Sequence, residues 1–148
     1  MMLAVLFEMD GRLWGADARL IETVIPAVRL RPVQGAPEWV AGAFNYMGMA
    51  VPAADLSTIV CSRPSERIFS TRYMLVKMSA GGREGLVALI AERVTGVAEI
   101  DDAEIGPSSG NSFAGGVFSA GGRIAQIVEI DRLARSEAAA EILGLFYP

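Results

Sequence analysis

The sequence contains no histidine and a single lysine, Lys77. Histidine is the commonest general base, and it completes Ser-His-Asp and Cys-His sites and most zinc sites. Its absence argues against these classes of enzyme. The remaining enzymatic alternative is carboxylate catalysis by Glu8, Asp10, Glu92 or Asp101, whose spacing defines no catalytic pair. We therefore predict that the protein is not an enzyme.

Cysteine is also scarce, since Cys61 is the only one. One cysteine cannot form an internal disulfide and fits a reducing compartment, so we expect a cytoplasmic location. No apolar run approaches the roughly 20 residues of a membrane-spanning helix. The apolar stretch Met1–Arg12 lacks a basic start, which favours a buried strand over a signal peptide. We predict no membrane insertion.

Basic charge is not concentrated anywhere in the chain. The net charge is −4 and the basic residues are scattered, whereas a nucleic-acid-binding protein normally has a concentrated basic face. We therefore expect no nucleic-acid partner.

Short apolar segments separated by glycine-rich turns dominate the chain, a pattern typical of an all-β barrel or sandwich. In the segment YMLVKM, Met74, Val76 and Met78 should face one way, and Leu75 and Lys77 the other. The predicted strands are Leu3–Met9, Leu13–Gly15, Val24–Leu30, Ala43–Tyr46, Met49–Ala53, Tyr73–Met78, Leu86–Glu92, Val97–Ile100, Gly116–Ser119 and Ile124–Ile130.

Two kinds of tight turn join these segments. Asp10-Gly11, within Met9–Arg12, predicts a two-residue hairpin turn. The pentapeptide SAGGR occurs at Ser79–Arg83 and again at Ser119–Arg123. No helix and no GK[ST] ending follows either copy, so we interpret both as hairpin turns and not as phosphate loops.

Three short helices are predicted. Asp17–Glu22 has Asp17 as a possible N-cap, and Pro37–Gly42 begins with proline and ends with glycine. Arg132–Phe146 places four apolar residues on one face, which favours packing on its own domain over binding a partner; they are Ala134, Ala138, Ile142 and Phe146.

The polar segment Cys61–Arg72 divides the strands into two sets. We therefore expect a single domain, 1–148, with two β lobes in succession. The first lobe would span about 1–66, the second about 67–131, and the C-terminal helix about 132–146.

One segment carries a recognisable motif. AGAFNYMGMAVPAADL, with the PEWV before it, matches the pattern P-x-x-h-x-G-h-h-N-h-R-G-x-h-h-P-h-h-D-L, where h is apolar. The matching residues are Pro37, Gly42, Asn45, Gly48, Pro52, Asp55 and Leu56. Later, LIAERV matches an apolar run followed by D-x-V, with Glu92 in place of Asp and Val94 retained, and GGRIAQIVEI matches a GR…LLDL element.

In this order, from about Leu3 to Leu133, these signals resemble the CheW-like family of bacterial chemotaxis coupling proteins. The sequence departs from that family at two positions: Met47 replaces the arginine of N-h-R-G, and Thr23 replaces the glutamate of V-x-E-V.

The resemblance implies two five-stranded SH3-like β-barrels packed side by side, with short helices and a C-terminal helix. It implies an adaptor without cofactor. One surface would bind the regulatory domain of a CheA-type histidine kinase, and another the cytoplasmic tip of a transmembrane methyl-accepting chemoreceptor. Because Met47 and Thr23 remove two charges, we expect a divergent or accessory pathway.

Several residues allow two interpretations. Asn45 suits a turn but could contact a partner, and Asp55 suits a helix cap or a partner-facing charge. Met47 either packs on Trp39 and Phe44 or offers a partner an adaptable apolar contact, and packing is favoured. Pro52 suggests an edge or bulged strand.

An adaptor needs exposed apolar anchors. The candidates are Ile21, Ile25 and Met47 on the first lobe and Met74 and Phe118 on the second, and Thr23 and Asn45 complete the expected partner-binding set. The alternative function is a small-molecule-binding β-barrel regulator with its pocket between the lobes.

Overall fold

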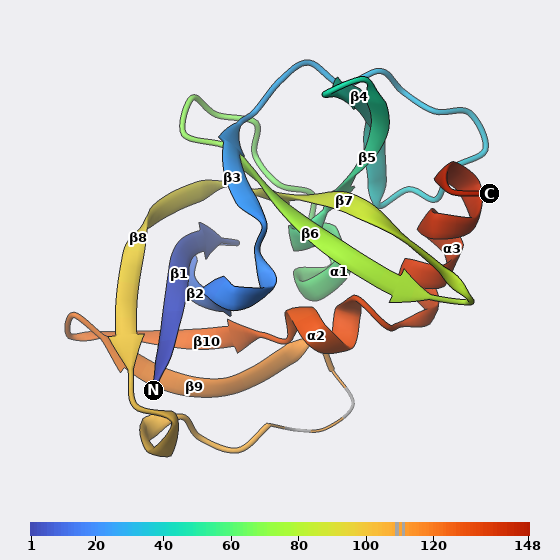
Figure 1. Ribbon diagram of the computed structural model, residues 1–148. Helices are drawn as coiled ribbons and strands as arrows, with labels where there is room; N and C mark the ends of the chain where they lie inside the picture. Colours follow the sequence, from blue (N-terminus) through green and yellow to red (C-terminus); the bar gives the residue numbers. More distant parts are fainter. Residues whose placement is uncertain (109, 111) are drawn as a thin grey trace.

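Ten strands form two curled sheets of five strands each in this computed structural model, which describes residues 1–108, 110 and 112–148 (Figure 1). Every predicted strand is present, so the all-β prediction is confirmed. The strands are β1 (Met2–Met9), β2 (Arg12–Asp17), β3 (Thr23–Pro26), β4 (Val40–Tyr46), β5 (Met49–Asp55), β6 (Arg72–Ala80), β7 (Arg83–Ala91), β8 (Arg93–Ile100), β9 (Ala114–Ala120) and β10 (Arg123–Val128).

The two lobes do not follow one another along the chain, so the predicted boundary near residue 66 is wrong. Sheet A has the order β8-β1-β2-β10-β9, and sheet B has the order β3-β6-β7-β5-β4. We call the part of the molecule built on sheet A lobe A and the part built on sheet B lobe B. Lobe B is therefore inserted between β2 and β8 of lobe A. The polar segment at Cys61–Arg72 joins two parts of lobe B, because β5 and β7 pair in parallel and need a connection that crosses over.

The predicted turns form as two-residue hairpins. Asp10 and Gly11 both have positive φ between β1 and β2. The two SAGGR copies connect β6 to β7 and β9 to β10, and their glycine pairs also have positive φ. Backbone conformations that favour glycine thus account for both copies.

Helix predictions succeed only in part. Asp17 caps the 3₁₀ helix η1 (Ala18–Leu20) by accepting a hydrogen bond from the backbone N–H of Arg19. The predicted helix Pro37–Gly42 is wrong, because β4 begins at Val40 and pairs with β5. A second 3₁₀ helix, η2 (Asp102–Glu104), follows β8.

The C-terminal segment contains two helices, α2 (Ile130–Leu133) and α3 (Glu137–Phe146), where one was predicted. Ser136 takes an extended conformation and caps α3 through Ala139, while Ala134 accepts a hydrogen bond from Ser79 of β6. As predicted, α3 packs on its own domain: Ala139, Ile142 and Leu143 are buried in the core.

Three apolar clusters make up the core. One fills lobe A around Phe118, and one fills lobe B around Tyr73. The largest lies between the lobes and includes Phe7, Trp14, Met74 and Leu133. Side chains of this cluster pack between the lobes, where the alternative function placed a ligand, and they leave a hollow of about 290 Å³ beside them, lined by charged residues such as Glu8, Glu66 and Arg93. No helix of the described residues is long and apolar enough to cross a membrane.

Candidate partner-binding site

The β4–β5 turn places Met47 at the tip of a hairpin. Met47 and Gly48 both have positive φ, as a type I′ turn requires. The side-chain oxygen Oδ1 of Asn45 accepts a hydrogen bond from the backbone N–H of Gly48 at 3.0 Å. Asn45 thereby stabilises the turn with its own side chain, the first of the two roles considered for it.

Met47 is 85% exposed, so the expectation that it packs on Trp39 and Phe44 is wrong. The backbone of a two-residue turn directs its side chain away from the strands. Phe44 instead packs inside lobe B, with its ring centroid 5.4 Å from that of Tyr73, and Trp39 packs against the inter-lobe core. Met47 is an exposed apolar side chain on a turn of fixed geometry.

Next to this turn, the end of the lobe B barrel opens in a hollow of about 380 Å³. Met49, Leu86 and Tyr147 supply its apolar lining, and Glu22 and Lys77 supply charge. Lys77 of β6 lies 3.6 Å from the carboxylate of Glu84 on the neighbouring strand β7. We call this hollow, together with the Met47 turn, the barrel mouth.

The remaining first-lobe candidates lie on and before β3, an edge strand of sheet B. Ile21 follows η1 and packs against the inter-lobe core, and Ile25 packs against the lobe B core. Thr23 is half-buried opposite Leu75. Glu22, between Ile21 and Thr23, lines the barrel mouth, so this segment borders the same opening as the turn.

Two predicted anchors are not at the surface. Met74 is fully buried in the inter-lobe core, and Phe118 is 4% exposed inside lobe A, against Gly15. Met74 shares its face of β6 with Val76 and Met78, as the alternation predicts, but that face packs against lobe A. Neither residue can contact a partner directly.

The motif residues of β4 and β5 have backbone roles. Gly42 has a φ of 154° beside a β-bulge, and a Cβ there would lie 2.6 Å from the backbone oxygen of Arg31. Pro52 is buried in β5, where pairing to β7 begins only at Ala53, so its missing N–H leaves no gap in that ladder. Pro37 precedes β4 and accepts a hydrogen bond from Val40.

Asp55 is the N-cap of α1 (Leu56–Cys61), a helix that the sequence did not predict. Its carboxylate accepts hydrogen bonds from the backbone N–H groups of Ser57 and Thr58 and from both the backbone and the side chain of Ser65. Asp55 is 6% exposed, so capping leaves no charge for a partner.

Glu92 is the single residue between β7 of sheet B and β8 of sheet A. Burial raises the pKa of its carboxyl group, and contacts with the backbone of Asp10 and Glu66 oppose that shift. Val94, two residues later, packs against the inter-lobe core. This motif element therefore marks the point where the chain crosses from one lobe to the other.

The carboxylates of the enzymatic alternative have structural partners. Glu8 pairs with Arg93 and Arg123, and Asp10 pairs with Arg12 and Arg63. Asp101 caps η2. In the part of the chain that the structure describes, no group of His, Cys, Asp and Glu side chains could hold a metal ion.

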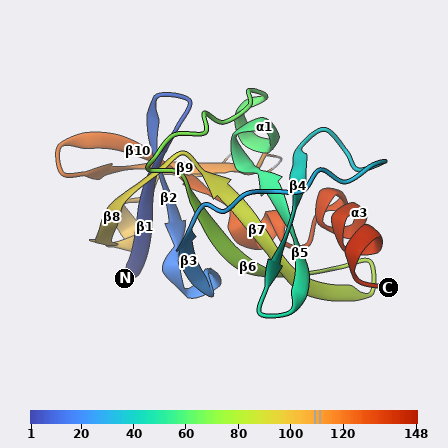
Figure 2. The same ribbon diagram turned by 90° about the horizontal axis from the view of Figure 1, so that it is seen from above.

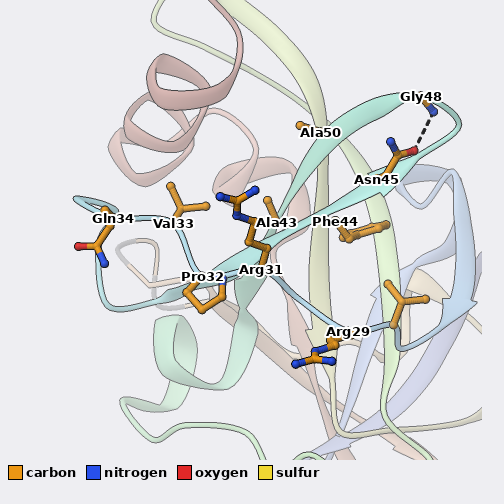
Figure 3. A pocket seen from close by; sticks show the side chains of 11 residues that line it. Arg29, Arg31, Pro32, Val33, Gln34, Ala43, Phe44, Asn45, Gly48 and Ala50 are labelled. Atoms are coloured by element: carbon orange, nitrogen blue, oxygen red, sulfur yellow. Dashed lines mark hydrogen bonds between the residues drawn. The ribbon is translucent and has the colours of Figure 1, made fainter.

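A larger hollow of about 910 Å³ lies on the other side of the β4–β5 hairpin (Figure 3). Met49 and Ala50 face opposite sides of β5, and Ala50 lines this hollow together with Phe44, Val33 and Arg31. In Figure 3 the Arg31 side chain lies between Val33 and Ala43. We call this hollow the β4 groove.

Sequence reasoning missed Tyr147, Met49 and the β4 groove. Tyr147 donates a hydrogen bond to the backbone oxygen of Leu86 at 2.7 Å, across 61 positions of sequence, which no local pattern indicates. Met49 belongs to a correctly predicted strand, and its position opposite Tyr46 beside the turn was a usable signal of exposure.

Comparisons with known proteins agree with this architecture. The model of the CheW-like domain family matches residues 3–138. A chemotaxis protein CheW from Rhizobium meliloti (strain 1021) is 28% identical over 112 residues, which cover 72% of this chain and 70% of the relative. The crystal structure of the scaffolding protein TtCheW from Thermoanaerobacter tengcongensis superposes with a TM-score of 0.73 at 22% identity, covering 86% of this chain and 83% of that one. The chain belongs to the CheW-like family.

Proposed function

We propose that this protein is a non-enzymatic adaptor that couples a transmembrane chemoreceptor to a CheA-type histidine kinase in a chemotaxis-like pathway. It would act in the cytoplasm, binding the kinase through its regulatory domain and the receptor through its cytoplasmic tip. Two separate binding faces on one small protein raise the local concentration of each partner near the other. The adaptor needs no chemistry of its own.

The observation that carries the proposal is the exposure of Met47 at the tip of the family's central motif. The turn holds the backbone at this point in a fixed geometry, and the flexible methionine side chain can adapt to an irregular partner surface. Met49, Leu86 and Tyr147 extend this apolar surface into the barrel mouth. We assign Met47 to direct partner contact, with Ile21, Thr23 and Ile25 along the adjoining edge and Asn45 holding the turn.

Met47 and Thr23 also bear on which partner binds. Arginine at position 47 would pair with a carboxylate in two-point geometry, whereas methionine cannot. An apolar tip instead favours a partner with an apolar recess at this point. We therefore place the protein in a divergent or accessory pathway, such as pilus motility or surface sensing.

The test is a binding assay of the purified protein against the CheA-type kinases and chemoreceptor tips of the same organism. Met47→Arg should weaken binding to at least one of them by about tenfold, as expected for loss of an interface anchor. Ile124→Ala is the matched control, since Ile124 is also apolar and 80% exposed, but on β10 of sheet A. Unchanged affinity of Met47→Arg for every kinase and receptor would remove Met47 from the interface.

Adaptor activity itself has a separate readout. Adding the protein to a purified kinase and receptor should increase the receptor-dependent autophosphorylation of the kinase. If no kinase–receptor pair of the organism responds and none binds, the proposed function is wrong.

A further inference from the structure

Most of the arginines that lack a carboxylate partner among the described residues lie at one end of lobe B. Among the described residues, six arginines have a carboxylate within 4.0 Å of the guanidinium. They are Arg12, Arg19, Arg63, Arg93, Arg123 and Arg135. Four of the other six lie on two neighbouring segments. Arg29 and Arg31 follow β3, Arg67 lies in the loop before β6, and Arg72 begins β6.

These two segments are held side by side. Pro26 of β3 pairs with Arg72 of β6, and the Tyr73 hydroxyl donates a hydrogen bond to the backbone oxygen of Val28 at 2.6 Å. Burial raises the pKa of Tyr73, and the charge of Arg67 and the hydrogen bond to Val28 oppose that shift. The two segments therefore bring several arginines to neighbouring parts of lobe B, on a chain whose net charge is −4.

The same surface exposes apolar side chains. Phe69 is fully exposed at the tip of the loop, and Val28 is also exposed. Val28 and Arg29 continue into the β4 groove, whose lining includes Val33 and Phe44. The surface thus joins a protruding aromatic ring to an apolar groove, with arginines along both.

The loop that presents Phe69 is internally braced. The buried Thr71 side chain accepts a hydrogen bond from the backbone N–H of Ile68 and donates one to the backbone oxygen of Glu66. Arg72 donates to the backbone oxygen of Phe69 at 3.2 Å. A side chain displayed on a preformed loop loses little further entropy on binding. Glu66, the only carboxylate of the loop, faces the hollow between the lobes instead.

The groove also has an open strand edge. Arg31 pairs with Ala43 of β4 through two backbone hydrogen bonds. This bridge is a single residue pair and does not extend along β4. Two residues after Ala43, the backbone groups of Asn45 point to the same open edge of β4. No strand pairs with them in the part of the chain described here. An extended peptide can pair with such an edge while its side chains enter adjacent pockets.

From these observations we infer that the β4 groove and the Phe69 loop form a docking surface for an extended acidic peptide segment that carries apolar side chains. Its carboxylates would pair with Arg29, Arg31 and Arg67, and its apolar side chains would lie against Phe69, Val28 and the groove. Figure 2 shows the loop before β6 and the β4–β5 turn at opposite sides of lobe B. The Phe69 loop is thus remote from the Met47 tip, whereas the β4 groove reaches the same turn at Asn45 and Gly48. The inference uses no property of the Met47 side chain and does not depend on the proposed function.

The test titrates the isotope-labelled protein with short synthetic peptides at low ionic strength, followed by amide chemical shifts. A repeating Glu-Glu-Leu peptide should shift residues 26–34, 43–50 and 67–72. Repeating Glu-Glu-Ser, without apolar groups, and Lys-Lys-Leu, with reversed charge, should bind at least about tenfold more weakly. Equal binding of all three peptides, or shifts confined to other regions, would overturn the inference.

Variants assign the two kinds of contact. Phe69→Ala and Arg31→Ser should each weaken Glu-Glu-Leu binding by about fivefold to tenfold. Their controls are Ile124→Ala and Arg83→Ser, an exposed apolar residue and another arginine without a carboxylate partner, which should not change it. Vesicles containing phosphatidylglycerol provide the competing result: if they bind the protein in a Phe69-dependent manner and the peptide does not, an anionic membrane is the ligand and the inference is wrong.

Discussion

A Cβ atom on Gly42 would lie 2.6 Å from the backbone oxygen of Arg31, closer than side chains approach backbone atoms in folded proteins. Gly42 also has a φ of 154°, which other residues rarely adopt. We expect Gly42→Ala to lower the free energy of unfolding by about 2–3 kcal/mol. The backbone strain of alanine at this φ and the displacement of Arg31 from its bridge to β4 both contribute to the loss. Urea unfolding measures the change.

Gly144→Ala is the matched control for this substitution. A Cβ on Gly144 meets nothing within 4 Å, and the residue lies in α3. Alanine should therefore stabilise the protein by about 0.5–1 kcal/mol through helix propensity. If both variants lose similar stability, the close contact at Gly42 is not the cause.

Met47→Asn should stabilise the isolated protein. Methionine at a φ of 51° carries a steric cost, whereas Asn-Gly is the preferred pair in a type I′ turn. The expected gain is about 0.5–1 kcal/mol in the free energy of unfolding. Met49→Asn, next to the turn in β5, should give no gain; a loss of stability in Met47→Asn would mean that the Met47 side chain contributes packing.

Asp55→Ala should cost about 2–3 kcal/mol in the free energy of unfolding, because it removes a helix cap and leaves buried N–H groups of α1 without an acceptor. Ser57→Ala tests the neighbouring position. The hydroxyl oxygen of Ser57 is buried with no hydrogen-bond partner among the described residues, so its removal should be neutral or slightly stabilising. Equal losses in the two variants would contradict this account of Asp55.

Glu92 should make stability depend on pH. Its folded-state pKa is raised above the ordinary value by burial, so the folded protein binds its proton more tightly than the unfolded chain does. Stability therefore falls as the pH rises from the unfolded value, about 4.5, through the folded one, and Glu92 adds no pH dependence below that window.

Glu92→Gln removes the titrating group. Because the side chain is partly exposed, we expect the gain in melting temperature at neutral pH to be no more than about 3 °C, and to vanish towards pH 4. Thermal melts of both proteins across this range measure it. A gain that persists at pH 4 would indicate a packing effect unrelated to the charge.

The strands could be predicted from the sequence because a hairpin turn and the alternation of apolar residues each depend on only a few consecutive residues. Asp10-Gly11 and both SAGGR copies form the turns expected of them. Alternation along β6 also grouped Met74, Val76 and Met78 correctly. It could not tell that this face meets lobe A, since that contact joins segments distant in sequence, and Met74 was therefore misplaced at the surface.

Tertiary contacts explain the other errors. The segment Leu56–Cys61 is rich in β-branched residues and has weak helix propensity. It is nevertheless helical, because Asp55 caps it and Leu56 is buried in the inter-lobe core. Conversely, Pro37–Gly42 has the punctuation of a helix, but pairing with β5 draws Val40–Gly42 into a strand.

The insertion of lobe B within lobe A has a consequence for folding. β1 pairs with β8, so Met2 lies opposite Ile100, and β2 pairs with β10, so Leu13 lies opposite Ala125. Contacts between such distant segments slow folding, because a long loop must close before they form. During synthesis the apolar faces of β1 and β2 stay uncovered until lobe B and then β8, β9 and β10 of sheet A have been synthesised.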